Sequence, residues 1–236
     1  PFAHASDALG REAERVLVAL RHDACAFEVR ELSELDKAEK ELAAEGITAK
    51  RATDEECEER QVNSALFFAD PNGNRVELVY RPYQTGVRYF PGRDAGITEF
   101  GHFGLHTGDS ERDIRFWTEV MSARVSDKIG EGALLRIDPV HHKIALFASE
   151  HTGVQHVNFQ VASIDDVMRS WYFLQEKNVP IVFGPGRHPT STAMFIYFLG
   201  PDKRVYEYSS GVKRITDEEN HTPRQFEMAP TSFCMW

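Results

Sequence analysis

The sequence predicts an α+β fold of two tandem modules, each assembled from paired βαβββ units that form curved mixed sheets. The first observation is an internal repeat, because residues 67–77 resemble residues 197–207 at a constant offset. The second is that a strand-like segment precedes a helix-like segment in each copy, at 26–29 and again at 158–161. Self-similarity of this kind indicates that one supersecondary unit is used more than once.

The repeated stretch reads as two strands joined by a tight turn. An aromatic pair leads into the turn in each copy, and a segment that alternates apolar and polar residues leaves it. Pro71 and Pro201 occupy the same place in the two turns, each followed by further turn-forming residues. Both copies are predicted to be β-hairpins, because Pro fixes φ and because Asn, Asp and Gly tolerate turn conformations.

Each copy also contains one amphipathic helix. Ser33 with Asp36, and Ser163 with Asp166, have the spacing of a capping box, in which the two side chains satisfy backbone N–H groups of the first turn. The first helix is expected to end near Gly46. Apolar residues recur at the intervals of one buried face; they are Leu35, Ala38 and Leu42 in the first helix and Ile164, Val167, Met168, Trp171 and Leu174 in the second.

The second copy has an additional front half with the same order of elements. A strand is predicted at 101–107 and a helix at 110–121, followed by strands near 124–128, 133–137 and 143–147. A complete module therefore contains two βαβββ units, and the first copy preserves mainly its second unit. Because the chain starts at Pro1 rather than Met, we expect a segment upstream of it.

These observations divide the chain into four parts. Residues 1–83 form an N-terminal module, which we expect to be incomplete and to lack a metal site, and residues 84–98 form a linker that carries Gly and Pro. Residues 99–211 form the C-terminal catalytic module, and residues 212–236 form a tail. The tail becomes apolar from Phe226 onward, so we expect its end to cover the site or to pack at a subunit interface.

Composition narrows the class of protein. The 236 residues carry a net charge of −10, from 27 basic and 37 acidic residues, which argues against a nucleic-acid partner because phosphate binding needs a basic surface. The three cysteines have no CxxC spacing, which is typical of a reducing cytosol, so a cytoplasmic location is expected. No apolar run approaches the roughly 20 residues that cross a bilayer, so no membrane partner is expected.

Three residues of the second module can meet at one metal ion. His102 lies on the first predicted strand, His156 at the start of the strand that opens the second unit, and Glu207 on the last strand. These positions are equivalent in a pseudo-symmetric pair of units, so their side chains can converge inside one curved sheet. Two imidazoles and one carboxylate leave one side open for a substrate and O2, which suits Fe(II) and also suits Mn(II).

Four further residues surround these candidates in the sequence. His141 and His142 begin a predicted strand, His188 lies in a Gly-Pro-Gly-Arg-His-Pro loop, and Tyr197 lies on the strand before Glu207. Each of them alone would be an ordinary loop or strand residue. Their combination, in order and beside a potential metal triad, indicates a catalytic site.

The residues of the second module resemble the type I extradiol dioxygenases of the vicinal oxygen chelate superfamily, which also contains glyoxalases and bleomycin resistance proteins. Catechol 2,3-dioxygenase and 2,3-dihydroxybiphenyl 1,2-dioxygenase belong to this family. The matching segments are Gly101-His102-Phe103, His141-His142-Lys143-Ile144-Ala145-Leu146, Gln155-His156-Val157-Asn158-Phe159, Gly186-Arg187-His188, Ile196-Tyr197-Phe198 and Tyr206-Glu207-Tyr208. The resemblance covers nearly the whole chain, because family members have two such modules and only the C-terminal one binds metal.

The resemblance implies a function and a role for each residue. The expected reaction is extradiol cleavage of a catechol-type diol with O2 at a mononuclear Fe(II) centre. His102, His156 and Glu207 match the iron ligands, and His188 and Tyr197 match groups that hydrogen-bond the substrate. His141 matches the acid–base histidine when its separation from His156 is used as the guide, although a slip of one residue would assign that role to His142. A homo-oligomer is also expected, as in many family members.

The first module serves as an internal comparison. Ala24 stands where His156 stands in the second module, Phe67 replaces Tyr197, and only Glu77 persists opposite Glu207. Two alternatives remain open at this point. One is another metal-dependent enzyme of the glyoxalase type, and the other is a metal-free protein that binds small molecules.

Overall fold

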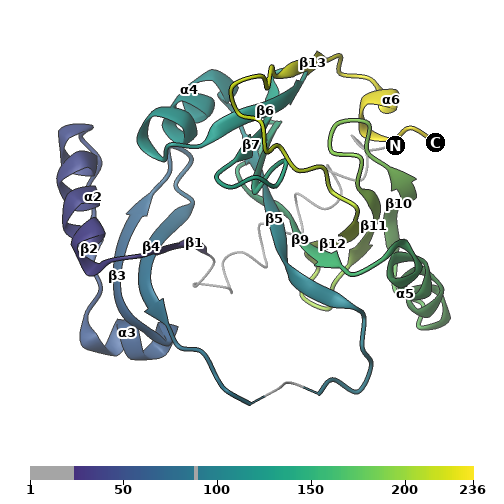
Figure 1. Cartoon of the computed structure of the whole chain (residues 1–236), viewed down its shortest axis with the longest axis horizontal. Coiled ribbons are helices and arrows are strands. Elements are labelled where there is room, and N and C mark those ends of the chain that lie inside the picture. The colour runs from purple at the N-terminus through teal and green to yellow at the C-terminus, as the bar shows by residue number, and fades with distance from the viewer. Residues whose placement is uncertain (1–23, 88–89) are drawn as a thin grey trace.

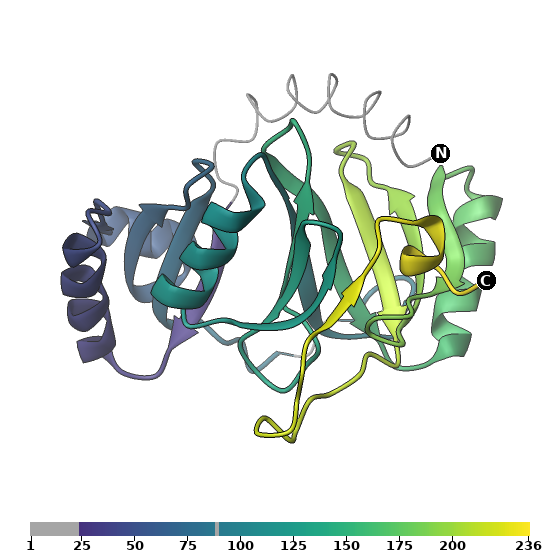
Figure 2. The same ribbon diagram turned by 90° about the horizontal axis from the view of Figure 1, so that it is seen from above.

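The computed structural model describes residues 24–87 and 90–236, and it contains two mixed sheets. A four-stranded sheet has the strand order β1-β4-β3-β2, and a nine-stranded sheet has the order β10-β11-β12-β9-β5-β8-β7-β6-β13. Figures 1 and 2 show the two sheets side by side, with α2 and α5 at the two outer ends and α4 between the sheets. The expected α+β class with curved mixed sheets is confirmed.

The four-stranded sheet is one βαβββ unit. Its elements are β1 (Ala24–Val29), α2 (Leu32–Ala44), β2 (Lys50–Arg51), α3 (Asp54–Arg60), β3 (Val62–Ala69) and β4 (Arg75–Pro82). Strands β3 and β4 form the predicted hairpin, in which Gly73 adopts a φ of 83°. Strand β1 closes the unit by pairing in parallel with β4.

The start of α2 differs from the prediction. The helix begins at Leu32 after the cap residue Glu31, whose backbone N–H donates to Glu34 Oε2 at 3.0 Å. The predicted pair of Ser33 and Asp36 is therefore wrong, because the Asp36 carboxylate pairs instead with Arg51 of β2. For α5 the predicted cap residue is confirmed, since Ser163 Oγ accepts a hydrogen bond from the Asp166 backbone N–H, but the Asp166 carboxylate accepts from the Ser163 hydroxyl rather than from a backbone N–H.

The nine-stranded sheet contains two βαβββ halves joined by the antiparallel pair β5 and β9. In each half the last strand returns parallel to the first, β8 beside β5 and β12 beside β9. The first half comprises β5 (Ile97–Thr107), α4 (Ser110–Arg115), the π-helical turn η1 (Phe116–Val120), β6 (Arg124–Ile129), β7 (Gly132–Arg136) and β8 (Ile144–Ala148). The second comprises β9 (Gly153–Val161), α5 (Ile164–Glu176), β10 (Ile181–Arg187), β11 (Met194–Leu199) and β12 (Val205–Ser210).

The C-terminal tail extends the sheet and returns to it. Strand β13 (Arg224–Phe226) pairs in parallel with β6, and the short helix α6 (Pro230–Phe233) follows. The backbone N–H of Met235 then donates to the Arg187 carbonyl at 2.8 Å, which ties the end of the tail to β10. The tail therefore packs against both halves of the nine-stranded sheet.

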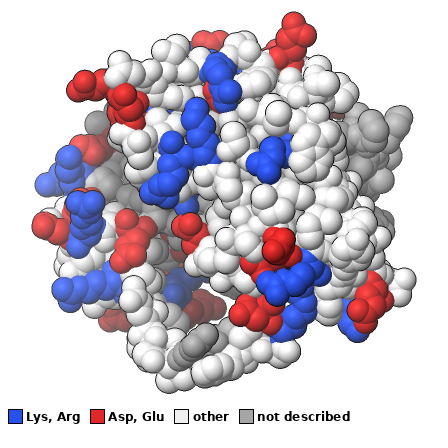
Figure 3. All heavy atoms as spheres, turned by 45° about the vertical axis from the view of Figure 1, so that its right-hand side comes forward, with Lys and Arg blue, Asp and Glu red and all other residues white. Residues whose placement is uncertain are grey.

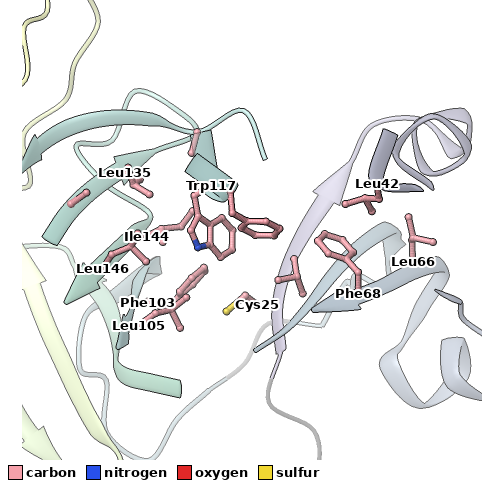
Figure 4. Packing of buried hydrophobic residues seen from close by; sticks show 14 of the residues in the cluster. Cys25, Leu42, Leu66, Phe68, Phe103, Leu105, Trp117, Leu135, Ile144 and Leu146 are labelled. Atoms are coloured by element: carbon pink, nitrogen blue, oxygen red, sulfur yellow. The ribbon is translucent and has the colours of Figure 1, made fainter. Parts of the chain in front are cut away.

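One hydrophobic core joins the two sheets (Figure 4). Trp117 of η1 is fully buried at its centre, with its ring centroid 5.9 Å from that of Phe27 and 6.1 Å from that of Phe103. Because side chains alternate along a strand, Phe103 on the core side of β5 leaves its neighbour His102 on the opposite face. The first module thus supports the strand that carries a candidate ligand.

The surface carries side chains of both charges. Figure 3 shows acidic and basic side chains both distributed over the face in view, with a broad uncharged area between them. Among the described residues, no helix has the length and apolar character needed to cross a bilayer.

Replacing Trp117 with Ala should lower the free energy of unfolding by about 3–5 kcal/mol, because the substitution leaves a cavity where the two sheets meet. Urea titration followed by circular dichroism would measure the change. Tyr172→Ala is the matched control, since that ring is 65% exposed on α5 and its loss should cost little. Equal stability of the two variants would contradict a shared core.

Candidate metal centre

Three side chains from neighbouring strands converge inside the nine-stranded sheet. His102 on β5, His156 on β9 and Glu207 on β12 are all buried. The Nε2 atoms of the two histidines lie 2.8 Å apart, and Glu207 Oε2 lies 3.2 Å from His102 Nε2 and 3.3 Å from His156 Nε2. Donor atoms held about 2.1 Å from one cation at adjacent octahedral positions are roughly 3 Å apart. The triad therefore fits one face of a metal's coordination sphere.

The electrostatics of the triad also fit a cation. Neither oxygen of Glu207 has a partner at hydrogen-bonding geometry, and a buried carboxylate without compensation is costly. Burial opposes ionisation of Glu207, but contacts from His102, His156 and His188 outweigh it and hold its pKa well below the usual range. Burial lowers the pKa of His102 to about 4, despite the opposing charge of Glu207. One anion and a neutral imidazole are thus ready to act as ligands.

Local sequence features shape this cluster. Gly104 pairs with His156 across the β5–β9 ladder, and a Cβ at that position would lie 2.5 Å from His156 Nδ1. Only glycine leaves space there for the imidazole. Gln155 Oε1 accepts a hydrogen bond from His156 Nδ1, which leaves Nε2 unprotonated toward the triad. Gln155 lies within one of the segments that match the family, but a sequence pattern does not reveal its contact with His156.

The structure brings His188 and Tyr197 to the same site. Tyr197 Oη lies 3.2 Å from His188 Nε2, and His188 Nε2 lies 3.5 Å from Glu207 Oε1. Burial, together with the neighbouring Glu207, raises the pKa of Tyr197 well above 10. The phenol therefore remains protonated and donates. His188 Nδ1 donates to the Phe233 carbonyl at 2.6 Å, so its Nε2 is left to accept from Tyr197.

The structure separates the two adjacent histidines. His142 lines the pocket, with its ring centroid 4.1 Å from that of His102. His141 is fully buried behind it, with Nε2 2.9 Å from Asp127 Oδ2. The spacing argument that favoured His141 therefore selects a side chain outside the pocket. Spacing misleads here because the loop between β8 and β9 can change length without moving the strands.

The pocket beside the triad is mainly apolar. Phe147, Phe183 and Thr190, which adjoin site residues in the sequence, line it. Its other walls include Ile129, Leu134 and Ala145, which sequence reasoning did not single out, and Phe233, which lies in the apolar end of the tail that we expect to cover the site or a subunit interface. Nothing in the local sequence of Ile129 or Leu134 indicates a site, because β6 and β7 reach the pocket only through the tertiary fold.

The first module has a different arrangement at the equivalent place. Glu77 is opposite Ala26 in the β1–β4 ladder, as Glu207 is opposite Asn158 in the β9–β12 ladder. The Glu77 carboxylate is buried and pairs with Arg75 Nε at 2.7 Å and Arg60 Nη2 at 3.0 Å. Two guanidinium groups thus neutralise this carboxylate. Within residues 24–87 and 90–236, His102, His156 and Glu207 are the one group of ligand-type side chains arranged for a metal.

Comparison with known proteins places these features in a superfamily. Residues 99–208, which include all three triad residues, match the profile of the Glyoxalase/Bleomycin resistance protein/Dioxygenase superfamily. An iron-dependent extradiol dioxygenase of Rhodococcus jostii is 26% identical over 81% of this chain and 71% of its own length. A 3-methylcatechol 2,3-dioxygenase of Pseudomonas putida is 27% identical over 80% of this chain and 70% of its own. The resemblance inferred from the motifs is confirmed.

Solved structures agree with this relationship. BphC, a halotolerant catechol dioxygenase, superposes with a TM-score of 0.82 at 26% identity, over 90% of this chain and 73% of its own. A Mn(II)-bound glyoxalase from Novosphingobium aromaticivorans superposes with a TM-score of 0.79, also at 26% identity, over 91% of this chain and 70% of its own.

Replacing Glu207 with Gln should abolish stable metal binding, because the substitution removes the one anionic donor of the triad. The loss should exceed the roughly 10- to 100-fold cost of disturbing a partner of a metal ligand. Metal content after dialysis against Fe(II) or Mn(II) would measure it. Glu77→Gln is the control and should bind metal as the parent does; a Glu207→Gln chain that keeps one metal ion would contradict the ligand assignment.

Proposed function

We propose that this protein opens the ring of a catechol-type diol by extradiol cleavage, with both atoms of O2 entering the product. The observation that carries the proposal is the buried group of two histidines and one glutamate, with His142, His188 and Tyr197 around the adjoining pocket. Fe(II) held by His102, His156 and Glu207 would supply an electron path between the diol and O2. Relatives described as iron-dependent and as acting on 3-methylcatechol support this choice.

The protein's own residues would orient the diol and manage its protons. His142 is the proposed acid–base residue, since it lines the pocket and its pKa is lowered well below 6.5, mainly by burial. It is therefore neutral at working pH and can accept a proton from a diol hydroxyl, then return it to the product. Tyr197 Oη donates its proton to His188 Nε2, so the phenol oxygen can accept a hydrogen bond from a diol hydroxyl and help to fix the diol beside the triad.

The pocket walls favour a neutral, apolar substituent on the ring. A second apolar compartment adjoins the first, and the two share Ile129, Leu134, Phe147 and Phe233. Among residues 24–87 and 90–236, no Lys or Arg lines either compartment. A carboxylate on the ring would therefore be buried without a counter-charge, which is unfavourable.

We also propose that residues 99–211 form the catalytic module, with residues 84–98 as the linker and residues 212–236 as the tail. The support is that all three triad residues and both proposed hydrogen-bonding residues lie within 99–211. The tail belongs to the site as well, because Phe233 lines the pocket.

Anaerobic loading with Fe(II), followed by O2 and a panel of diols, tests the function. We expect one O2 consumed per diol and a new visible absorbance from the ring-opened product. 3-Methylcatechol and 2,3-dihydroxybiphenyl should exceed 3,4-dihydroxybenzoate in kcat/KM by at least about tenfold, because the latter buries its carboxylate. Bound metal with no oxygen uptake across the panel would refute the proposal. Turnover of a hemithioacetal without O2 would instead favour glyoxalase chemistry, which the Mn(II)-bound relative suggests.

His142→Phe should retain metal but lose about 10²- to 10⁴-fold in kcat, the usual contribution of acid–base catalysis. Steady-state oxygen uptake with parallel metal analysis would measure both. Phe is a close match in shape, so the pocket should stay intact. Full activity in His142→Phe together with a large loss in His141→Phe would return the role to His141.

A further inference from the structure

A buried chain of hydrogen bonds lies directly behind the pocket, and the proposed reaction gives it no role. His142 Nδ1 lies 3.1 Å from His141 Nδ1, and His141 Nε2 lies 2.9 Å from Asp127 Oδ2. His141 and Asp127 are both fully buried. Asp127 belongs to β6, so the chain of hydrogen bonds connects the pocket wall to the strand that pairs with β13 of the tail.

The tail holds Asp127 as an ionised acceptor. The backbone N–H and Nε of Arg224 donate to Asp127 Oδ1 at 2.9 and 3.1 Å, and Arg224 Nη2 donates to Oδ2 at 2.6 Å. Burial opposes ionisation, but hydrogen bonds from His141 and Arg224 outweigh it and lower the pKa of Asp127 to about 2. Both oxygens therefore accept, and neither carries a proton.

The carboxylate at one end determines which atom donates in each hydrogen bond of this series. Because the Asp127 carboxylate can only accept, His141 must donate from Nε2, and a neutral imidazole then has a bare Nδ1. Burial lowers the pKa of His141 even though Asp127 opposes this, so the neutral form is favoured. The bare Nδ1 of His141 requires a donor, which is Nδ1–H of His142. The remaining nitrogen of His142, Nε2, is therefore unprotonated.

We propose that Asp127 and His141 are positioning residues that fix the tautomer of His142, so that it presents a bare Nε2 to the bound diol. This inference rests on the acid–base role proposed for His142. It assigns His141 a defined task although that residue does not line the pocket. It also assigns a task to Arg224, whose side chain links the tail to His142 through Asp127 and His141.

Replacing Asp127 with Asn should reverse the donor and acceptor roles along this chain of hydrogen bonds. The Asn Oδ1 would stay with the two Arg224 donors that now share one oxygen, which places Nδ2–H₂ toward His141. His141 Nε2 would then accept, its Nδ1 would donate to His142 Nδ1, and His142 would carry its proton on Nε2. A serine protease in which the aspartate of the triad is changed to Asn loses activity through the same kind of tautomer error.

Nitrogen-15 NMR of histidine-labelled full chain tests the tautomers directly, with Zn(II) in the triad as a diamagnetic probe. In the parent chain, His142 should show a protonated Nδ1 and a bare Nε2, and His141 the opposite pattern. In Asp127→Asn both patterns should exchange. A parent spectrum with the proton of His142 on Nε2 would overturn the proposal, and this holds even where the variant does not fold.

Kinetics of the Fe(II)-loaded chain supply the second readout. Asp127→Asn should lower kcat by about 10- to 100-fold, as for other groups that orient a functional histidine, and should leave KM and metal content unchanged. Glu218→Gln is the matched control, because Glu218 pairs with Arg136 and Arg124 in the same region without contacting the chain of hydrogen bonds; it should keep parental kcat. Unchanged kcat in Asp127→Asn would contradict the proposal. A parent chain without ring cleavage would refute the proposed function alone, since the NMR experiment does not depend on turnover.

Discussion

The buried carboxylate of Glu207 is the constraint on which the C-terminal module depends. A charge in this interior is unfavourable unless a cation or several donors compensate it. Its nearest polar neighbours are imidazole nitrogens on β5 and β9, which favour a shared metal ion over a simple ion pair. The curvature of the sheet, the glycine at position 104 and the orientation of His156 by Gln155 all serve to place these donors together.

The first module compensates its buried carboxylate in a different way. Its hairpin places Glu77 where Glu207 lies in the second module, and it is buried equally deeply. Arg60 and Arg75 neutralise it there, so the carboxylate needs no metal. The same backbone unit therefore supports a structural ion pair in one copy and a candidate metal centre in the other. The choice depends on a few side chains rather than on the fold.

The tail completes the site from outside the repeated units. The Phe233 carbonyl fixes the proton on His188 Nδ1, and Arg224 holds Asp127 ionised behind His141. Both contacts control which histidine nitrogen carries a proton. A segment with little secondary structure thus sets the hydrogen-bonding capacity of two residues on the rigid sheet.

The sequence by itself predicted the repeated βαβββ unit, the resemblance to the superfamily and the convergence of His102, His156 and Glu207. It could do so because strand alternation and turn chemistry are local, and because His102 and His156 lie on the first strands of the two halves while Glu207 lies on the strand that pairs with β9. Only the tertiary structure decided that His142 rather than His141 lines the pocket, and that Asp127, Arg224 and Phe233 contact the site residues. These relationships join segments far apart in the chain, and they depend on loop length and on packing of the tail, neither of which a local pattern encodes.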